Sequence, residues 1–262
     1  MDPIILQSTL WIGGIGLVSA VALAIADKYL SVPEDPRIER VSSLLPGANC
    51  GGCGFAGCAD YARAIIAKGA DLNLCAPGGA VCSNAIASLL GRAAVALEKR
   101  TALVLCCGDD DEATRRAAYN GINDCAAAQA TAGGDKGCSY GCLGYGSCAR
   151  VCPANAITVR SGLAKVDKKR CIACGKCVTV CPRKIIRLAP AAATIHVLCS
   201  SKDKGPAVKK VCGTGCIGCR LCTKLADGAI TMDGFLAVID YSTPLTNEET
   251  VAVCPTHCIR KA

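Results

Sequence analysis

The pattern of apolar and polar positions divides the chain into one long apolar segment and a remainder of short apolar runs. Residues 4–26 contain no charged side chain. As a helix rising about 1.5 Å per residue, this segment would reach about 34 Å, enough to cross a hydrocarbon core of about 30 Å. The pattern therefore predicts one transmembrane helix at the N-terminus.

Charges flanking this segment predict its orientation. Lys28, Arg37 and Arg40 follow it, and no Lys or Arg precedes it. By the positive-inside rule we expect a single pass through the cell (inner) membrane, with the N-terminus outside and the rest of the chain in the cytoplasm. A cleaved signal peptide is the alternative, since residues 24–26 resemble a cleavage site. However, the charged leading region is missing and the apolar stretch is too long for one.

The remaining hydrophobic pattern indicates short elements. Residues 60–70 have the spacing of a short helix. Strand-like apolar runs at 104–106 and 197–199 each end in a cysteine. Similar short runs at 154–157 and 183–186 each directly follow a Cys-Pro pair, which indicates an internal repeat.

Composition changes the picture, because the chain has 23 cysteines but only nine aromatic residues among its 262. Few large side chains are present to build an ordinary core, and thiolate–metal bonds replace apolar burial in small domains. An odd number of cysteines at short spacings favours metal ligands in a reducing compartment over a disulfide framework.

The first cysteine set lies in a glycine-rich loop. Cys50, Cys53 and Cys58 are close together in sequence, and Cys75 follows 17 residues later. We expect these four thiolates to form one iron–sulfur site, whose potential is tuned by hydrogen bonds from nearby backbone N–H groups. Zinc stays open here, because four cysteines also suit a tetrahedral zinc ion.

The same loop formally matches a dinucleotide-binding motif through Gly52, Gly54 and Gly57. No hydrophobic strand leads into it, and cysteines stand between and directly after the glycines. We therefore expect no direct binding of NAD or flavin by this chain.

The most specific motif has the spacing with which bacterial ferredoxins hold [4Fe-4S] clusters: Cys171-x2-Cys174-x2-Cys177-x3-Cys181-Pro182. A related run precedes it: Cys138-x3-Cys142-x5-Cys148-x3-Cys152-Pro153. In two-cluster ferredoxins the fourth cysteine of each run ligates the other cluster. One cluster is therefore expected on Cys138, Cys142, Cys148 and Cys181. The other is expected on Cys171, Cys174, Cys177 and Cys152. Tyr145 stands where a middle ligand would be, and Cys138 is expected to supply the missing thiolate.

A third run has lost half of its ligands. Ala226 occupies the place of its crossing cysteine, and no cysteine stands at the three positions expected for a second run. The four ligands of one cluster remain: Cys216, Cys219, Cys222 and Cys254. We interpret this segment as a degenerate ferredoxin-like domain with one cluster, which brings the expected total to about four [4Fe-4S] clusters.

Seven cysteines stay without a firm role: Cys82, Cys106, Cys107, Cys125, Cys199, Cys212 and Cys258. We interpret them as buried reduced thiols, which are common in protein cores. The alternative is that a longer repeat brings four of them to a further site: Cys106, Cys125, Cys199 and Cys212. His196 and His257 show no ligand spacing and are expected to be structural or on the surface.

The formal net charge of +8 comes mostly from Lys and Arg in the second half of the chain. A basic surface attracts acidic partners. Nucleic acid is disfavoured, because few aromatic residues that could stack on bases accompany the basic ones. An acidic redox protein suits the composition better.

Three motifs carry a resemblance to a known family: LPGANCGGCGFAGC at 45–58, GCSYGCLGYGSC at 137–148, and CIACGKCVTVCP at 171–182. With the anchor helix, they resemble the B subunit of the Rnf complex, a membrane-bound ferredoxin:NAD oxidoreductase that couples electron flow to sodium or proton translocation. The resemblance runs from residue 1 to about 190. The tail, with GCIGCRLC at 215–222, resembles the additional ferredoxin module of longer members.

The resemblance implies an electron-transfer subunit that accepts electrons from reduced ferredoxin and relays them toward other integral membrane subunits, with NAD reduced elsewhere. No catalytic side chain is then expected, and basic residues within 165–187 are expected to dock acidic ferredoxin. Two alternatives stay open. One is the related complex that keeps a redox-sensing transcription factor reduced. The other is a zinc-bound membrane scaffold or nucleic-acid adaptor, which would be colourless.

The expected fold class is α+β, and five segments are predicted. They are a transmembrane anchor (1–30), a four-Cys [4Fe-4S] domain (31–95), a connecting segment (96–137), a two-cluster ferredoxin-like domain (138–190) and a degenerate one-cluster ferredoxin-like domain (191–262).

Overall fold

The structure is a computed structural model that describes residues 3–30, 35–93 and 98–261. Its first element is the continuous helix α1 (Pro3–Leu30). Within it, Thr9–Ala26 is long and apolar enough to cross a membrane, and none of this window is buried against the protein. The predicted apolar helix is confirmed. Two of the predicted segment boundaries fall next to or within residues that the structure does not describe: the boundary after residue 30 adjoins 31–34, and the boundary after residue 95 lies within 94–97.

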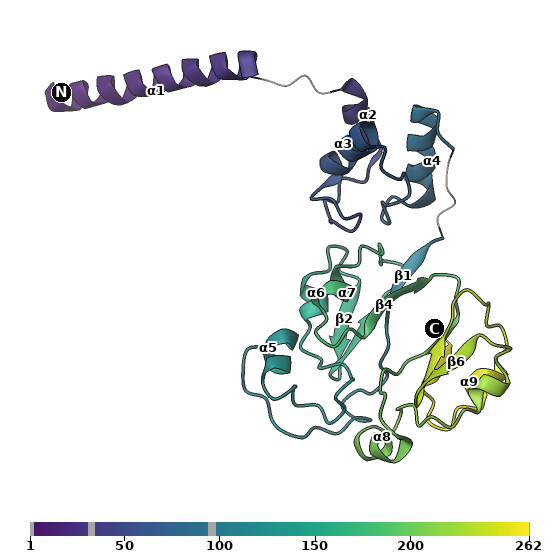
Figure 1. Cartoon of the computed structure of the whole chain (residues 1–262). Coiled ribbons are helices and arrows are strands. Elements are labelled where there is room, and N and C mark those ends of the chain that lie inside the picture. Colours follow the sequence, from purple (N-terminus) through teal and green to yellow (C-terminus); the bar gives the residue numbers. More distant parts are fainter. Residues whose placement is uncertain (1–2, 31–34, 94–97, 262) are drawn as a thin grey trace.

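Three helices follow α1 and enclose a small core (Figure 1): α2 (Pro36–Leu44), α3 (Cys58–Lys68) and α4 (Gly79–Leu90). The helix predicted at 60–70 is α3. Its core residue Tyr61 is 1% exposed and packs with Val41 and Ile86. The Tyr61 hydroxyl donates to the carbonyl of Asp71 at 2.6 Å and accepts from the N–H of Leu74 at 3.3 Å. These bonds fix the segment between α3 and α4.

A first group of strands follows. The outer strands β1 (Arg100–Val104) and β4 (Ile186–Pro190) pair antiparallel, with Ala102 opposite Leu188. Between them in sequence lies the antiparallel hairpin of β2 (Ile157–Arg160) and β3 (Leu163–Val166). The same stretch contains the short helices α5 (Cys125–Ala130), α6 (Ser147–Arg150) and α7 (Lys176–Val180).

A second group repeats this plan. The outer strands are β5 (Ile195–Val197) and β8 (Ile259–Lys261), and the inner hairpin is β6 (Ile230–Asp233) with β7 (Leu236–Ile239). Its helical turns are α8 (Gly205–Val211), η1 (Cys222–Lys224) and α9 (Glu249–Ala252). In Figure 1 the first group is coloured blue to green and the second green to yellow.

Equivalent hydrogen bonds close the two groups. Leu105 N–H donates to Ile185 C=O at 2.7 Å in the first, and Leu198 N–H donates to Cys258 C=O at 2.7 Å in the second. The inner hairpins show the same alternation, in which the first residue is buried and the second exposed. We call residues 100–190 the first repeat and residues 195–261 the second repeat. The strand-like runs predicted at 104–106 and 197–199 overlap the ends of β1 and β5.

Candidate metal centres

The first site gathers the four cysteines expected from the glycine-rich loop. Cys58 begins α3, and its N–H donates to the Asn49 side-chain oxygen at 2.9 Å. Burial raises the pKa of Cys75, and three neighbouring thiols raise it further: Cys58, Cys53 and Cys50. Cys75 thus lies within electrostatic reach of the other three, as a shared site requires.

A second predicted set also comes together. Burial raises the pKa of Cys177 to about 11, and three neighbouring thiols add to this rise: Cys171, Cys174 and Cys152. Two backbone N–H groups donate to sulfur, Ala102 to Cys171 at 3.4 Å and Ala156 to Cys152 at 3.3 Å. Such N–H···S bonds favour the thiolate form that binds iron.

This set lies next to the first site. Among the thiols that raise the pKa of Cys174, after the dominant effect of burial, is Cys50 of the glycine-rich loop. The loop that carries Cys50 and the loop that carries Cys174 are therefore neighbours. The first cysteine set and the set that contains Cys174 are therefore adjacent in space, although they are far apart in sequence.

The remaining crossed set differs from the expectation at one position. Cys142, Cys148 and Cys181 line one cavity, and the fourth thiol in its lining is Cys125. Burial raises the pKa of Cys148 to about 12, and three of the thiols that raise it further are Cys142, Cys125 and Cys181. Cys138, which the sequence predicted here, lines a different cavity.

Asp124 explains how Cys125 reaches this position. It is the N-cap of α5, where its carboxylate accepts from the N–H groups of Ala126 and Ala127. Its other oxygen accepts from the Ser147 hydroxyl at 2.7 Å, and that hydroxyl accepts from the Cys125 N–H at 2.8 Å. Because Ser147 precedes Cys148, one carboxylate ties both cysteines together. The pKa of Asp124 is lowered to about 2, chiefly by the hydrogen bond that its carboxylate accepts from Ser147.

The sequence contained one indication that this set differs from the usual pattern. Tyr145 stands at the middle-ligand position, and its ring packs edge-on against Tyr119 at 5.2 Å between centroids. The equivalent position of the second repeat is Cys219, three residues before Cys222 as Tyr145 is three residues before Cys148. Tyr145 thus indicated a position without a thiol, but nothing in the sequence indicated that α5 would bring Cys125 into the same cavity.

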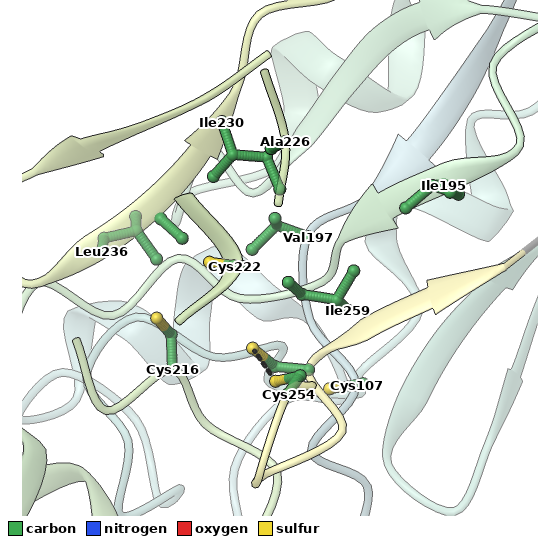
Figure 2. Close-up of a cluster of buried hydrophobic side chains, with 12 residues drawn as sticks. Cys107, Ile195, Val197, Cys216, Cys222, Ala226, Ile230, Leu236, Cys254 and Ile259 are labelled. Carbon is green, nitrogen blue, oxygen red and sulfur yellow. Dashed lines mark hydrogen bonds between the residues drawn. The ribbon is translucent and has the colours of Figure 1, made fainter. Parts of the chain in front are cut away.

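The last predicted set lies in the second repeat, where one cavity is lined by Cys216, Cys219, Cys222 and Cys254. Figure 2 shows three of them, Cys216, Cys222 and Cys254, within the buried core of this repeat. Cys258 lines the cavity too, with its sulfur 3.6 Å from that of Cys254. Hydrogen bonds with Cys258 lower the pKa of Cys216 to about 6 and that of Cys254 to about 4, and they raise that of Cys258. Cys258 is therefore a fifth thiol in this cavity, in hydrogen-bond contact with the predicted ligand Cys254.

Two further cysteines without a predicted role behave as protonated thiols. Cys82 donates to the Leu44 carbonyl at 3.3 Å, and Cys107 donates to the Thr214 carbonyl at 3.4 Å. Burial raises the pKa of each to about 11. His196 is fully buried and bonds Tyr241 through Nδ1 at 2.9 Å, which places it in the core and away from the sets above.

These sets suit a multinuclear centre. Within residues 3–30, 35–93 and 98–261, no three Cys, His, Asp or Glu side chains converge on the position of a single ion. A [4Fe-4S] cluster binds each of its four thiolates through a different iron, so its ligands surround a cavity and need not meet at one point. Thiol-lined cavities with N–H···S donors fit that requirement.

Family comparisons assign the chemistry. The family described as "Putative Fe-S cluster" matches residues 45–77, and the family described as "LdpA Fe-S cluster-binding domain" matches residues 138–192. The chain is an iron–sulfur protein.

Curated relatives extend this over nearly the whole chain. The chain is 42% identical to the B subunit of the ion-translocating oxidoreductase complex of Methanosarcina acetivorans, over 99% of both chains. It is 44% identical to the B subunit of the Na(+)-translocating ferredoxin:NAD(+) oxidoreductase complex of Acetobacterium woodii, over 95% of this chain and 75% of the relative. It is 41% identical to the proton-translocating counterpart of Clostridium ljungdahlii, over 94% and 88%. The chain belongs to this family, the B subunits of the ion-translocating oxidoreductase, or Rnf, complexes.

Proposed function

We propose that this chain is the membrane-anchored electron-transfer subunit that accepts electrons from reduced ferredoxin and relays them within an ion-translocating ferredoxin:NAD oxidoreductase complex. The observation that carries the proposal is the adjacency of separate thiol sets, with Cys50 of the first site next to Cys174 of another. Adjacent cysteine sets that each hold a cluster would form a route for electrons. The names of two relatives, both B subunits of ferredoxin:NAD(+) oxidoreductase complexes, support ferredoxin and NAD as the two ends of that route.

The proposed cofactors are [4Fe-4S] clusters, one on each of four thiol sets. Three sets are those predicted from the sequence, and in the remaining one Cys125 joins Cys142, Cys148 and Cys181. We assign the cluster segments as a four-Cys domain (31–95), a connecting segment (96–137) and ferredoxin-like modules (138–190 and 191–262). The connecting segment then has a chemical role, because it supplies Cys125.

The clusters supply reversible one-electron exchange when bound. A cluster held by these thiolates would accept one electron from reduced ferredoxin, with no transfer of a proton and no covalent bond made or broken. The chain holds the thiolates, donates N–H···S bonds that tune each potential, and limits water access through burial. No side chain acts as an acid, base or nucleophile in this step.

The proposed donor docks on the basic surface of the first repeat. Six basic side chains of 165–187 are exposed: Lys165, Lys169, Arg170, Lys176, Lys184 and Arg187. Arg183 has a different task, because it is half-buried and donates to the carbonyls of Gly141 at 3.0 Å and of Cys138. An acidic ferredoxin would be steered to the exposed group.

The proposed location is the cell membrane, with α1 as a single span, the N-terminus outside and the cluster-bearing part in the cytoplasm. Other integral membrane subunits are the proposed onward partners. Gly16, Ala20 and Ala24 share one face of α1, where small side chains allow a neighbouring helix to approach.

The test is anaerobic mixing of the full-length, cluster-loaded protein with reduced ferredoxin. We expect the visible absorbance of the chain's clusters to bleach as ferredoxin is reoxidised, with one electron gained for each ferredoxin consumed. Absence of bleaching by ferredoxin in a protein that dithionite does bleach would contradict the proposal. A colourless protein containing zinc would instead support the scaffold alternative, which neither iron–sulfur family match favours.

A further inference from the structure

A cavity between the two repeats is lined by cysteines that the four proposed clusters do not use. Its lining includes Cys106 and Cys138 from the first repeat, and Cys199 and Cys212 from the second. We propose a fifth iron–sulfur cluster at this interface, held by Cys106, Cys138, Cys199 and Cys212. This inference rests on the proposed electron-transfer function and extends it.

The four thiols are two equivalent pairs. Cys106 lies two residues beyond the end of β1, and Cys199 lies two residues beyond the end of β5. Cys138 and Cys212 each precede the first cysteine of a cluster run by four positions. The repeat therefore places one thiol of each kind on each side of the cavity, which is the arrangement a four-ligand site between two repeats requires.

Contacts across the interface support this arrangement. The Cys106 sulfur lies 3.9 Å from the carbonyl oxygen of Gly108, and a Cβ added at Gly108 would lie 2.9 Å from the sulfur of Cys212 in the other repeat. The Gly213 N–H donates to the Glu112 carbonyl at 2.8 Å, and the Thr114 N–H donates to the Val211 carbonyl at 3.0 Å. Backbone bonds thus hold the Cys212 segment against the first repeat.

Glycines leave room beside the sulfur atoms. A Cβ added at Gly108 would lie 2.9 Å from the Cys212 sulfur, and one added at Gly141 would lie 3.5 Å from that of Cys138. Side chains at these positions would occupy space next to the ligands. Their absence allows the backbone to approach the sulfurs closely, as it does around cluster ligands.

A buried lysine supplies an independent indication. Lys136 lines the cavity, is 1% exposed, and donates from Nζ to the Gly108 carbonyl at 2.7 Å. In the part of the chain that the structure describes, no carboxylate forms an ion pair with it. Burying an ammonium without a counter-charge is costly. Four thiolates and the anionic cluster they hold would provide the negative charge.

Cys107 also lines this cavity, but its contacts exclude it from the proposed ligand set. Its thiol donates to the Thr214 carbonyl, and its side chain packs in the core of the second repeat with Ile195 and Val197. The equivalent position of the second repeat, Ser200, has no thiol. Cys107 therefore offers a matched control in the same cavity.

The fifth cluster would join the clusters of the two repeats. The N–H of Cys142, a proposed ligand in the first repeat, donates to the Cys106 sulfur at 3.4 Å. The N–H of Cys216, a proposed ligand in the second, donates to the Cys199 sulfur at 3.2 Å. One peptide group on each side thus contacts the interface site directly, so an electron could pass from the first repeat to the second through it.

The first experiment is iron and sulfide quantification on the full-length protein, purified anaerobically. We expect about 20 iron atoms per chain, since each cubane holds four. The double variant Cys106→Ala/Cys212→Ala should lose about four of them, whereas the control Cys82→Ala/Cys107→Ala should lose none. A wild-type content of about 16, or equal iron in the two double variants, would overturn the fifth cluster.

A second measurement does not depend on folding of the double variant. In an EPR-monitored redox titration, Lys136→Met should lower the midpoint potential of one cluster, because a positive charge that favours the reduced form is removed. Lys202→Met, at an exposed lysine, should shift none. Unchanged potentials in Lys136→Met would contradict the proposed site. If ferredoxin bleaches the protein but the chain holds only about 16 iron atoms, the fifth cluster alone is rejected. If the chain holds about 20 iron atoms but ferredoxin does not bleach it, the ferredoxin proposal alone is rejected.

Discussion

Gly52 lies against the backbone of Cys174, so closely that a Cβ added at Gly52 would be 2.6 Å from the Cys174 carbonyl oxygen. Gly52 belongs to the glycine-rich loop of the first site, and Cys174 belongs to a loop of the first repeat. Only a residue without a side chain permits this approach. The two cysteine-containing loops therefore contact each other through backbone atoms.

This contact predicts the effect of bulk at Gly52. Gly52→Val should push the two loops apart and slow electron transfer between their clusters severalfold, while the iron content stays that of the wild type. Flash-reduction kinetics on the full-length protein measure the rate. Ala56→Val, at an exposed position of the same loop, is the control and should leave the rate unchanged. A wild-type rate in Gly52→Val would show that electrons do not cross this contact.

The second prediction concerns Cys125. Cys125→Ala should remove or damage one cluster, with up to about four iron atoms lost per chain, because its thiolate completes a four-ligand set. Cys82→Ala, which removes a thiol that donates to the Leu44 carbonyl, should keep the full iron content. Iron quantification with reduced-state EPR makes the comparison. A wild-type iron content in Cys125→Ala would show that Cys125 is not a ligand and would favour Cys138 as the fourth ligand of this set.

Asp124 offers a subtler change at the same place. Asp124→Asn keeps the shape of the N-cap but weakens the bonds to Ser147 and Arg150. We expect the cluster to assemble and then to be lost faster on exposure to a chelator. The visible absorbance followed over time gives the rate. Asp240→Asn, at a carboxylate that bonds Ser242, should match the wild type.

The fourth prediction concerns ferredoxin docking. Reversing three exposed charges, in Lys169→Glu/Arg170→Glu/Lys176→Glu, should lower the association rate about tenfold or more at low salt. The same reversal at Lys209, Lys210 and Lys224, three basic residues of the second repeat, is the control. Stopped-flow measurements over a range of ionic strength make the test. A rate insensitive to salt in the wild type would exclude electrostatic docking.

The fifth prediction is a pH dependence from His196. Burial, together with the charge of Lys168, lowers the pKa of His196 to about 4. The unfolded chain takes up this proton below about pH 6.5, so it binds more protons than the folded chain between pH 6.5 and 4. Stability should therefore be complete above pH 6.5 and fall below it, by about 1 kcal/mol at pH 5.5.

The check on this prediction compares unfolding by denaturant at pH 7.5 and pH 5.5 in the wild type and in His196→Gln. The variant should lose less stability than the wild type over this interval, whatever its absolute stability. Equal losses in the two proteins would assign the pH dependence to other groups.

The sequence predicted which cysteines lie together where they are close in the chain or follow a fixed crossing rule. Cys50, Cys53 and Cys58 share one short loop, and the spacing from Cys171 to Cys181 leaves the backbone few alternatives. Cys125 escaped prediction because it is supplied by an inserted segment of no regular spacing, and its position depends on Asp124 and Ser147. The equivalence of Cys138 and Cys212 was visible in the sequence, but their convergence depends on how two repeats pack.

The pairing of β1 with β4 has a consequence for synthesis of the chain. Arg100 pairs with Pro190, so the first repeat cannot close until the ribosome has added some ninety residues after its first strand. Cys142, Cys148 and Cys152 emerge earlier, as open thiols without their crossing partners. The first site, complete by Cys75, has no such delay. Iron delivery should therefore proceed along the chain in order, and a ribosome stalled before Cys171 would carry one complete ligand set and a row of thiols vulnerable to oxidation.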